Sequence, residues 1–353
     1  MQWDLFCRVV DNLGDIGVCW RLAADLAARG ERTRLFVDDA SALQWMAPAG
    51  ATGVVVTDWA GAARAADPGD VVIEAFGCEL PAAFVTRMVG RARPPVWINL
   101  EYLSAEGYVE RSHGLRSPQT RGPGAGLDKW FFYPGFTART GGLIREPALV
   151  QRQRWFDAPA WLAAHRATPM PGEQIVSLFC YDNGALPALL DHLSARPTLL
   201  IATAGHAARQ VAALLGPSMQ RGALRARALP ALTQVDFDHL LWASNLNFVR
   251  GEDSFVRAQW AGVPFVWQAY PQSDSVHLDK MEAFLERFLV GAPPGLDAPL
   301  RQVWRTWNSA ARPLPSMWPD PQLWRQHCAA WCETLCGQID LGSQLLSFAA
   351  ESR

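Results

Sequence analysis

The chain has 353 residues, of which 50% are hydrophobic and 19% are charged, and its formal net charge is −2. This composition is typical of a globular protein, and the length suits two domains better than one. A charge so close to zero provides no overall positive field that would attract nucleic acid or an anionic membrane. Neither is therefore an expected partner.

Three features of the sequence indicate a cytoplasmic protein. No uninterrupted apolar run approaches the ~18 residues that span a bilayer. The N-terminal segment Met1–Asp4 lacks the basic and apolar stretches of a signal peptide. The seven cysteines are odd in number and scattered, which favours a reducing compartment over a disulfide framework.

Short apolar runs alternate with helical patterns in the first half of the chain. The helix expected at Val18–Ala28 is followed by Gly30, which is placed to end it. Glycine and proline interrupt the pattern over residues 101–142, and loops of that length are usually functional or mobile. The expected strands are Trp3–Val9, Thr33–Val37, Val54–Val56, Val71–Phe76, Val96–Leu100 and Phe131–Phe136.

A second alternating series begins near Gln174, after a linker at Met170–Gly172. Its expected strands are Ile175–Cys180, Thr198–Thr203, Leu224–Leu229, Leu246–Val249 and Phe265–Trp267. Its expected helices are Pro187–Ser194, His206–Leu215, Val235–Ala243, Phe255–Ala261 and Val276–Phe288. Such alternation predicts an α/β protein with two Rossmann-like domains and a ligand cleft between them. The predicted domains are 1–168 and 169–320, followed by a helical segment 321–353 that could pack back on the first domain.

The first candidate site is the stretch Asp11–Gly17, between the first predicted strand and the first predicted helix. Ligands of open α/β sheets bind at this end of the strands. The glycine spacing fits neither a dinucleotide fingerprint nor a P-loop. Because Asp11 and Asp15 would repel phosphate, the loop suits a catalytic base or a cationic substrate group. The alternative is structural: Asp15 caps the helix and Asp11 organises the turn.

A second candidate site lies at the strand ends of the second half. Its polar residues are Arg250, Glu252, Asp253, Ser254, Tyr270 and Gln272. Asp253 or Ser254 is expected to cap the next helix, whose N-terminus would attract an anion, and Arg250 suits phosphate. Glu252 could reach a sugar hydroxyl. The alternative is a salt-bridged, well-capped helix start without a ligand.

Aromatic and amide side chains add candidates for holding a nucleobase. Phe179 and Tyr181 end a predicted strand, where they could stack a base, although such rings more often serve packing. Gln234 and Phe237 lie at a predicted helix start and could supply a hydrogen bond and a stacking face.

Metal binding is not expected. Asp236 and Asp238 form a D-x-D motif, but they fall in a predicted helix, where residues two apart do not share a face. Cys328, Cys332 and Cys336 are spaced as one stripe of a helix, which we expect to be core.

These motifs together resemble one family, the arginine rhamnosyltransferases of translation elongation factor P. The blocks that carry the resemblance are WDLFCRVVDNLGDIGVCWRLAADLA, NLEYLSAE, SHGLRSPQ, KWFFYPGFTARTGGLIRE, RGEDSFVRAQWAGVPFVWQAYPQ and HLDKMEAFL. They extend from Trp3 to about Leu285, and the first and fifth are long and specific. Gln268 and Ala269 depart from a more usual His-Ile, and Ala231 stands where the family can carry an aromatic residue.

The resemblance implies a GT-B fold, in which two facing Rossmann-like domains enclose a cleft. It further implies an inverting transfer of rhamnose from dTDP-β-L-rhamnose to an arginine of elongation factor P, without a metal or other cofactor. Carried across by motif, the catalytic residues are Asp11, Asp15 and Glu252. The residues assigned to the nucleotide sugar are Asn12, Gly14, Phe179, Tyr181, Gln234, Phe237, Arg250, Glu252, Asp253, Ser254, Tyr270 and Gln272.

The mechanism expected from this resemblance is a direct displacement, with the donor in the second domain and the acceptor guanidinium facing Asp11 and Asp15. We assign Asp15 as the base, Asp11 as its orienting partner and Glu252 to the sugar, although the sequence leaves the order of the two aspartates open. The arginine-containing loop Ser112–Gly126 is either a docking surface for the acceptor or a solvated loop. Two other functions remain open: a sugar-nucleotide epimerase of the same fold, and a non-enzymatic two-lobed ligand-binding protein.

Overall fold

The computed structural model of the protein describes residues 1–11, 13–64, 67–271, 276–309 and 318–352. Contacts divide the chain into two compact units, one formed by Met1–Pro147 with Gly337–Arg353 and the other by Ala148–Cys336. Among the described residues, no helix is both long and apolar enough to cross a membrane.

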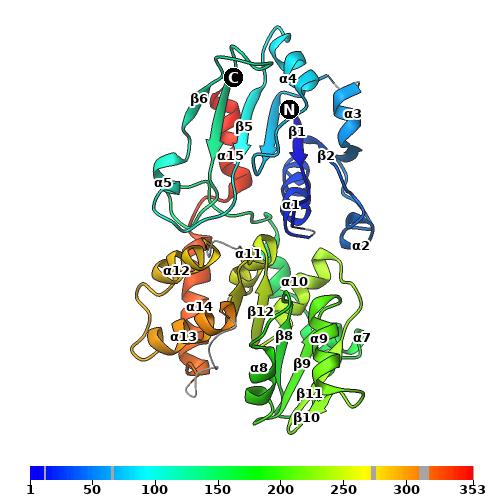
Figure 1. Ribbon diagram of the computed structural model, residues 1–353, viewed down its shortest axis with the longest axis vertical. Helices are drawn as coiled ribbons and strands as arrows, with labels where there is room; N and C mark the ends of the chain where they lie inside the picture. The colour runs from blue at the N-terminus through cyan, green and yellow to red at the C-terminus, as the bar shows by residue number, and fades with distance from the viewer. Residues whose placement is uncertain (12, 65–66, 272–275, 310–317, 353) are drawn as a thin grey trace. The chain divides into compact units, whose positions relative to one another are not determined.

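The first unit is built on a seven-stranded sheet with the order β3-β2-β1-β4-β5-β7-β6 (Figure 1). Its strands are β1 (Gln2–Cys7), β2 (Arg32–Val37), β3 (Val54–Asp58), β4 (Val71–Ala75), β5 (Val96–Leu100), β6 (Arg116–Pro118) and β7 (Asp128–Phe132). Neighbouring strands are parallel except β6 and β7. This is the strand order of a Rossmann half, and it confirms the parallel α/β prediction.

Helices cover both faces of this sheet. They are α1 (Gly14–Ala28), α2 (Leu43–Met46), α3 (Trp59–Arg64), α4 (Ala82–Val89), α5 (Val109–Ser112) and α15 (Leu341–Glu351). Successive side chains of a strand point to opposite faces. Accordingly, Leu5 of β1 packs in one core with α1 and α15, while Phe6 packs in a second core with α4. The strand is therefore buried on both sides, as parallel strands usually are.

The first helix begins earlier than expected, at Gly14 rather than Val18, and it ends where the sequence predicted. Gly30, just beyond its end, has a φ of 93°, a left-handed conformation that favours glycine.

The C-terminal helix α15 belongs to the first unit because a partly buried polar network holds it there. The Arg29 guanidinium donates to Asp340 Oδ1 at 2.7 Å and to Ser343 Oγ at 2.8 Å. Leu341 and Leu345 of the same helix are fully buried in the core with α1. This part of segment 321–353 thus packs on the N-terminal unit.

The second unit contains a six-stranded sheet with the order β10-β11-β9-β8-β12-β13. Its strands are β8 (Gln174–Leu178), β9 (Thr198–Ala202), β10 (Gln220–Arg221), β11 (Leu224–Ala228), β12 (Leu246–Arg250) and β13 (Phe265–Gln268). Apart from the antiparallel hairpin of β10 and β11, neighbouring strands are parallel. The five parallel strands repeat the Rossmann order of the first unit.

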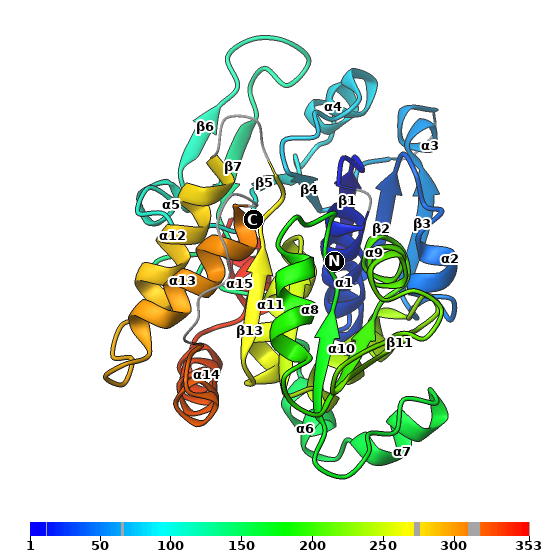
Figure 2. The same cartoon turned by 60° about the horizontal axis from the view of Figure 1, so that its bottom comes forward.

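The helices of the second unit are α6 (Leu149–Arg154), α7 (Ala158–Ala164), α8 (Leu186–Leu193), α9 (His206–Leu215), α10 (Gln234–Ala243), α11 (Glu252–Ala261), α12 (Val276–Phe288), α13 (Asp297–Asn308) and α14 (Pro321–Cys336). Figure 2 shows α8 and α9 on one side of the strands, with α10 and α11 behind them. Right-handed crossovers produce this division, because the chain reverses its direction across the sheet after β11.

Three hydrogen bonds account for the boundaries of the second unit. Its first helices pack onto it rather than onto the first unit: Gln153 Nε2 donates to the Ala261 carbonyl at 3.0 Å, and Trp161 Nε1 donates to Asp236 Oδ1 at 3.1 Å. The division at residue 147 therefore precedes the expected boundary at 168. Helix α14 also stays in this unit, since Trp331 Nε1 donates to Gln259 Oε1 at 2.8 Å. The expected segment 321–353 is thus shared between the two units.

Candidate active site

The loop after β1 is organised by one buried carboxylate. Asp15 is only 3% exposed, and its Oδ2 accepts hydrogen bonds of 2.9 Å from the backbone N–H groups of Val10 and Asp11. Burial raises the pKa of the Asp15 carboxyl above its ordinary value, while these two donors act in the opposite direction. The other oxygen, Oδ1, accepts from the Tyr102 hydroxyl at 3.4 Å.

One part of the structural alternative for this loop is wrong, because Asp15 does not cap the helix, but Asp11 does organise the turn, since its carbonyl accepts from the Gly14 N–H at 3.0 Å. Residue Leu13 is the N-cap of α1 and provides no side-chain cap, so Asp15 lies inside the first turn and folds back onto the preceding loop. Asp11 is half-buried beside it, and a Cβ at Gly14 would lie 2.5 Å from Asp11 Oδ2. Glycine at position 14 therefore allows the Asp11 carboxylate to approach the start of the helix. Asn12 lies outside the described residues.

Sequence reasoning missed Tyr102, which follows β5. Its ring stacks on Phe76, which follows β4, with a centroid distance of 4.2 Å and an interplanar angle of 10°. The signal was available, because Tyr102 stands in the block NLEYLSAE directly after a predicted strand. We call Asp11, Asp15 and Tyr102 the Asp15 cluster.

In the second unit, Arg250 at the end of β12 lies over two aromatic rings. Its guanidinium carbon is 4.6 Å from the ring centroid of Phe179 and 4.2 Å from that of Tyr181. Both rings follow β8, which pairs with β12 in the sheet. Cation–π attraction therefore fixes the direction of a guanidinium at the carboxyl end of the sheet. Phe179, Tyr181 and Arg250 form what we call the Arg250 cluster.

Helix α11 begins at Glu252, three residues before the predicted start at Phe255. Gly251 is the N-cap, with a φ of 66°, and no side chain caps the helix. The prediction that Asp253 or Ser254 would be the cap is therefore wrong: both lie in the first turn, together with Glu252. The Ser254 hydroxyl donates instead to the Arg250 carbonyl. The helix N-terminus still adjoins the Arg250 cluster, as an anion site requires.

The remaining nucleotide candidates lie against this cluster. Gln234, the first residue of α10, donates from Nε2 to Asp253 Oδ2 at 3.2 Å. Phe237 of the same helix meets Phe179 edge to face, with a centroid distance of 5.3 Å. The structure thus brings the starts of α10 and α11 together with the ends of β8 and β12.

Residues at the end of β13 and just after it complete the group. Tyr270 is half exposed and meets Tyr181 edge to face at 5.4 Å. Gln268, noted in the sequence as a departure, is buried and accepts from the Tyr181 backbone N–H at 2.9 Å. It therefore joins the ends of β13 and β8 and sets the position of Tyr181. Gln272 lies outside the described residues.

The aspartates of the D-x-D motif point to different structural partners. Asp236 accepts from Trp161 and from the Thr233 hydroxyl, whereas Asp238 is buried against Arg257, with two hydrogen bonds of 2.7 and 3.0 Å. Within the described ranges, no group of three or more His, Cys, Asp or Glu side chains is placed to hold a metal ion.

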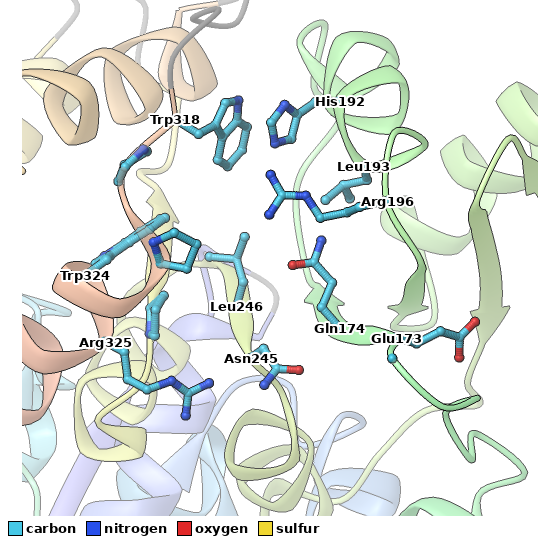
Figure 3. Close-up of a pocket in the computed structure, with 14 residues that line it drawn as sticks. Glu173, Gln174, His192, Leu193, Arg196, Asn245, Leu246, Trp318, Trp324 and Arg325 are labelled. Atoms are coloured by element: carbon cyan, nitrogen blue, oxygen red, sulfur yellow. The ribbon is translucent and has the colours of Figure 1, made fainter.

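A cavity of about 440 Å³ lies elsewhere in the second unit. It is bounded by Gln174 at the start of β8 and Leu246 at the start of β12, with Arg196 at one wall and Trp318 stacked on His192 at 4.0 Å (Figure 3). These are the amino ends of the strands, whereas all the candidate residues above follow carboxyl ends. None of the predicted site residues lines it.

Two Rossmann-type units with polar side chains at the carboxyl ends of their parallel strands are the architecture of GT-B proteins. Solved glycosyltransferases share the fold: VinC in complex with dTDP matches with a TM-score of 0.51 and 15% identity, over 100% of both chains. Residues 3–350 match the family model of elongation factor P rhamnosyltransferase EarP, and the chain belongs to this family.

Individual relatives agree with this assignment. The protein-arginine rhamnosyltransferase of Pseudomonas putida is 44% identical over 99% of both chains, and that of Pseudomonas aeruginosa is 43% identical with the same coverage. A solved structure that describes EarP-mediated arginine glycosylation of elongation factor P matches with a TM-score of 0.69 and 32% identity, covering 100% of this chain and 99% of that one. The family and enzyme class predicted from the sequence are confirmed, and neither an epimerase nor a binding protein is favoured.

Proposed function

We propose that this enzyme transfers L-rhamnose from dTDP-β-L-rhamnose to an arginine side chain of translation elongation factor P, with inversion at the anomeric carbon. The observation that supports this most is the Asp15 cluster: a buried carboxylate at a strand end, in a chain of the elongation factor P rhamnosyltransferase family. Because translation is cytoplasmic, the proposed acceptor also places the enzyme in the cytoplasm.

The second unit is the proposed donor site. Arg250, whose guanidinium lies over the rings of Phe179 and Tyr181, would face the diphosphate together with the N-terminal end of α11. A fixed positive charge there offsets the negative charge that grows on the leaving diphosphate, so it stabilises the transition state more than the ground state. In this proposal Asp253 and Ser254 contribute through their backbone N–H groups at the helix start.

The base and the sugar are assigned to other side chains of the same unit. Gln234 and Phe237 would hold the thymine by a hydrogen bond and a ring contact, with Tyr270 beside them. Glu252, the first residue of α11, is assigned to a sugar hydroxyl. A carboxylate can accept a hydrogen bond from a hydroxyl without carrying a proton itself.

The first unit is the proposed acceptor site. A guanidinium is a weak nucleophile because it is cationic, with a pKa above ~12. Carboxylates at Asp11 and Asp15 would orient it and concentrate its charge. One guanidinium nitrogen then attacks C1 of rhamnose, the bond from C1 to the diphosphate oxygen breaks, and Asp15 takes the proton that the nitrogen loses. The products are rhamnosyl-arginine, dTDP and one proton on the carboxylate.

The test is mass spectrometry of elongation factor P after incubation with the enzyme and dTDP-β-L-rhamnose. We expect the mass of one rhamnose on a single arginine peptide, and no change with the Asp15→Asn enzyme. A control without elongation factor P separates the rivals, since an epimerase would consume the nucleotide sugar without an acceptor. Unmodified acceptor with intact wild-type enzyme would contradict the proposal.

A further inference from the structure

The two oxygens of the Asp15 carboxylate are held by different kinds of partner. Oδ2 accepts from two backbone N–H groups of its own loop, each at 2.9 Å, so its position depends on residues close in sequence. Oδ1 accepts from the hydroxyl of Tyr102, which is 87 residues away. The rotation of the carboxylate about its terminal bond therefore depends on a side chain from another strand end.

Tyr102 is itself held by a residue in a strained conformation. Phe76 has a φ of 58°, which is rare for a bulky aromatic residue and costs energy unless its surroundings enforce it. The surroundings do so here: the Phe76 N–H donates to the Leu100 carbonyl at 2.7 Å, and the next N–H, that of Gly77, donates to Asn99 Oδ1 at 3.2 Å. This conformation places the Phe76 ring flat against Tyr102. Strain of this kind collects at functional sites.

We propose that Tyr102, supported by Phe76, is a positioning residue for the Asp15 carboxylate in the transfer reaction. This inference rests on the proposed role of Asp15 as the base. The ring of Tyr102 stacks on Phe76 and its hydroxyl donates to Asp15. The position of the Asp15 carboxylate therefore depends on the positions of the ends of β4 and β5.

The Tyr102 hydroxyl also lowers the pKa of the Asp15 carboxyl. A donor favours the ionised form of a carboxylate, so Tyr102 opposes the rise that burial imposes on the pKa of Asp15. Of the described residues, Asp11 also faces Asp15 and its charge raises that pKa, and the Cys19 thiol lies near the same carboxylate. Hydrogen bonding to Cys7 and burial hold the pKa of the Cys19 thiol well above its usual value, so that thiol stays neutral.

The experiment is the Tyr102→Phe substitution, which removes the hydroxyl and keeps the ring on Phe76. We expect the acid limb of the kcat profile to move to higher pH by roughly half a unit, which lowers kcat about threefold on that limb. The KM for dTDP-rhamnose should not change. Tyr108→Phe is the matched control, since Tyr108 is 40% exposed and Tyr102 is 39% exposed in the same unit.

A second measurement does not depend on turnover. Carbon-13 NMR of aspartate-labelled enzyme follows the titration of Asp15, whose signal is identified by its loss in Asp15→Asn. We expect the midpoint to rise in Tyr102→Phe and, by a smaller amount, in Phe76→Leu. An unshifted titration together with a superimposable pH profile would overturn the positioning role. Loss of activity at every pH with an unshifted titration would also overturn it, because a structural role alone explains that result.

The two hypotheses fail in different experiments. The base assignment fails when Asp15→Asn retains wild-type turnover, whatever Tyr102→Phe does. The positioning role fails when Asp15→Asn is inactive and Tyr102→Phe leaves both the titration and the pH profile unchanged. Equal thermal unfolding temperatures and equal dTDP affinities in all the variants would show that the fold and the second unit are intact.

Discussion

The two strand-end clusters hold opposite charges by opposite means. In the Asp15 cluster, a buried carboxylate accepts hydrogen bonds from two backbone N–H groups, whose dipoles stabilise its charge. In the Arg250 cluster, a guanidinium lies over two aromatic rings, so its charge is stabilised by ring faces. Both arrangements hold an ionisable side chain at the carboxyl end of a parallel sheet. The field of each ion can act on a substrate there.

This comparison predicts that each cluster serves a different substrate. An anionic cluster suits a cationic acceptor, and a cationic cluster suits an anionic donor. Variants in one cluster should therefore change the handling of one substrate and leave the other unaffected. The tests below run from the largest expected effect to the smallest.

The largest effect is expected from Asp15→Asn. The change removes the proposed base and keeps the shape, so turnover should fall by about 10²–10⁴-fold. Affinity for dTDP, measured by calorimetry, should stay at the wild-type value because the residues proposed to hold the base and the diphosphate belong to the other unit. Asp39→Asn, at an exposed position of the same unit, is the control. A loss of dTDP binding in Asp15→Asn would contradict the prediction that each cluster serves a different substrate.

The next effect is expected from Arg250→Ala. Hydrogen bonds to charged groups contribute about 1.5–3 kcal/mol, so dTDP should bind roughly 10–150-fold more weakly. Binding of elongation factor P without nucleotide should not change. Arg209→Ala removes the same charge from α9 and serves as the control. Unchanged dTDP affinity in the Arg250 variant would mean that the diphosphate binds elsewhere.

Substitution of Arg250 by lysine sharpens the same test. Lysine keeps the charge but loses the planar group that stacks on Phe179 and Tyr181 and that binds phosphate through two hydrogen bonds. We expect dTDP affinity between that of the wild type and that of Arg250→Ala. Wild-type affinity would show that charge alone is sufficient.

A smaller effect is expected at the proposed docking loop Ser112–Gly126. Arg116 already forms a 2.7 Å salt bridge with Asp128, so reversing its charge would also set two carboxylates side by side. Arg121 is exposed, and no ion pair with another described residue is found for it. Arg121→Glu should therefore weaken elongation factor P binding by a few-fold, since exposed pairs contribute about 0.2–1 kcal/mol. Equal titration curves for mutant and wild type would exclude this docking role.

No effect is expected from metal removal. Asp236 and Asp238 are held by Trp161, Thr233 and Arg257, so neither is arranged as a ligand. Turnover in excess EDTA should equal that in buffer alone. A loss on chelation that Mg²⁺ or Mn²⁺ restores would show that the Arg250 cluster does not act alone on the diphosphate.

Much of the fold was predictable from the local pattern of the chain. Strand β5 and helices α9 and α12 have the predicted bounds, and nearly all the other predicted elements shifted by a few residues. The division of segment 321–353 between the two units was not predictable, because α14 and α15 are both helices of this segment but pack on different units. Amphipathic periodicity shows that a helix buries one face, but it does not name the surface that covers it.

The sequence by itself determined which residues stand at strand ends: Asp11 and Asp15 after the first strand, and Arg250 after the strand of the second half. Tertiary structure alone decided their partners. Tyr102 reaches Asp15 from another strand end, and Phe179 and Tyr181 lie against Arg250 from a neighbouring strand. The reason is that parallel strands are joined through long crossovers, so side chains that meet at one sheet edge are far apart in the chain. A local sequence pattern therefore does not show which distant residues meet at a sheet edge.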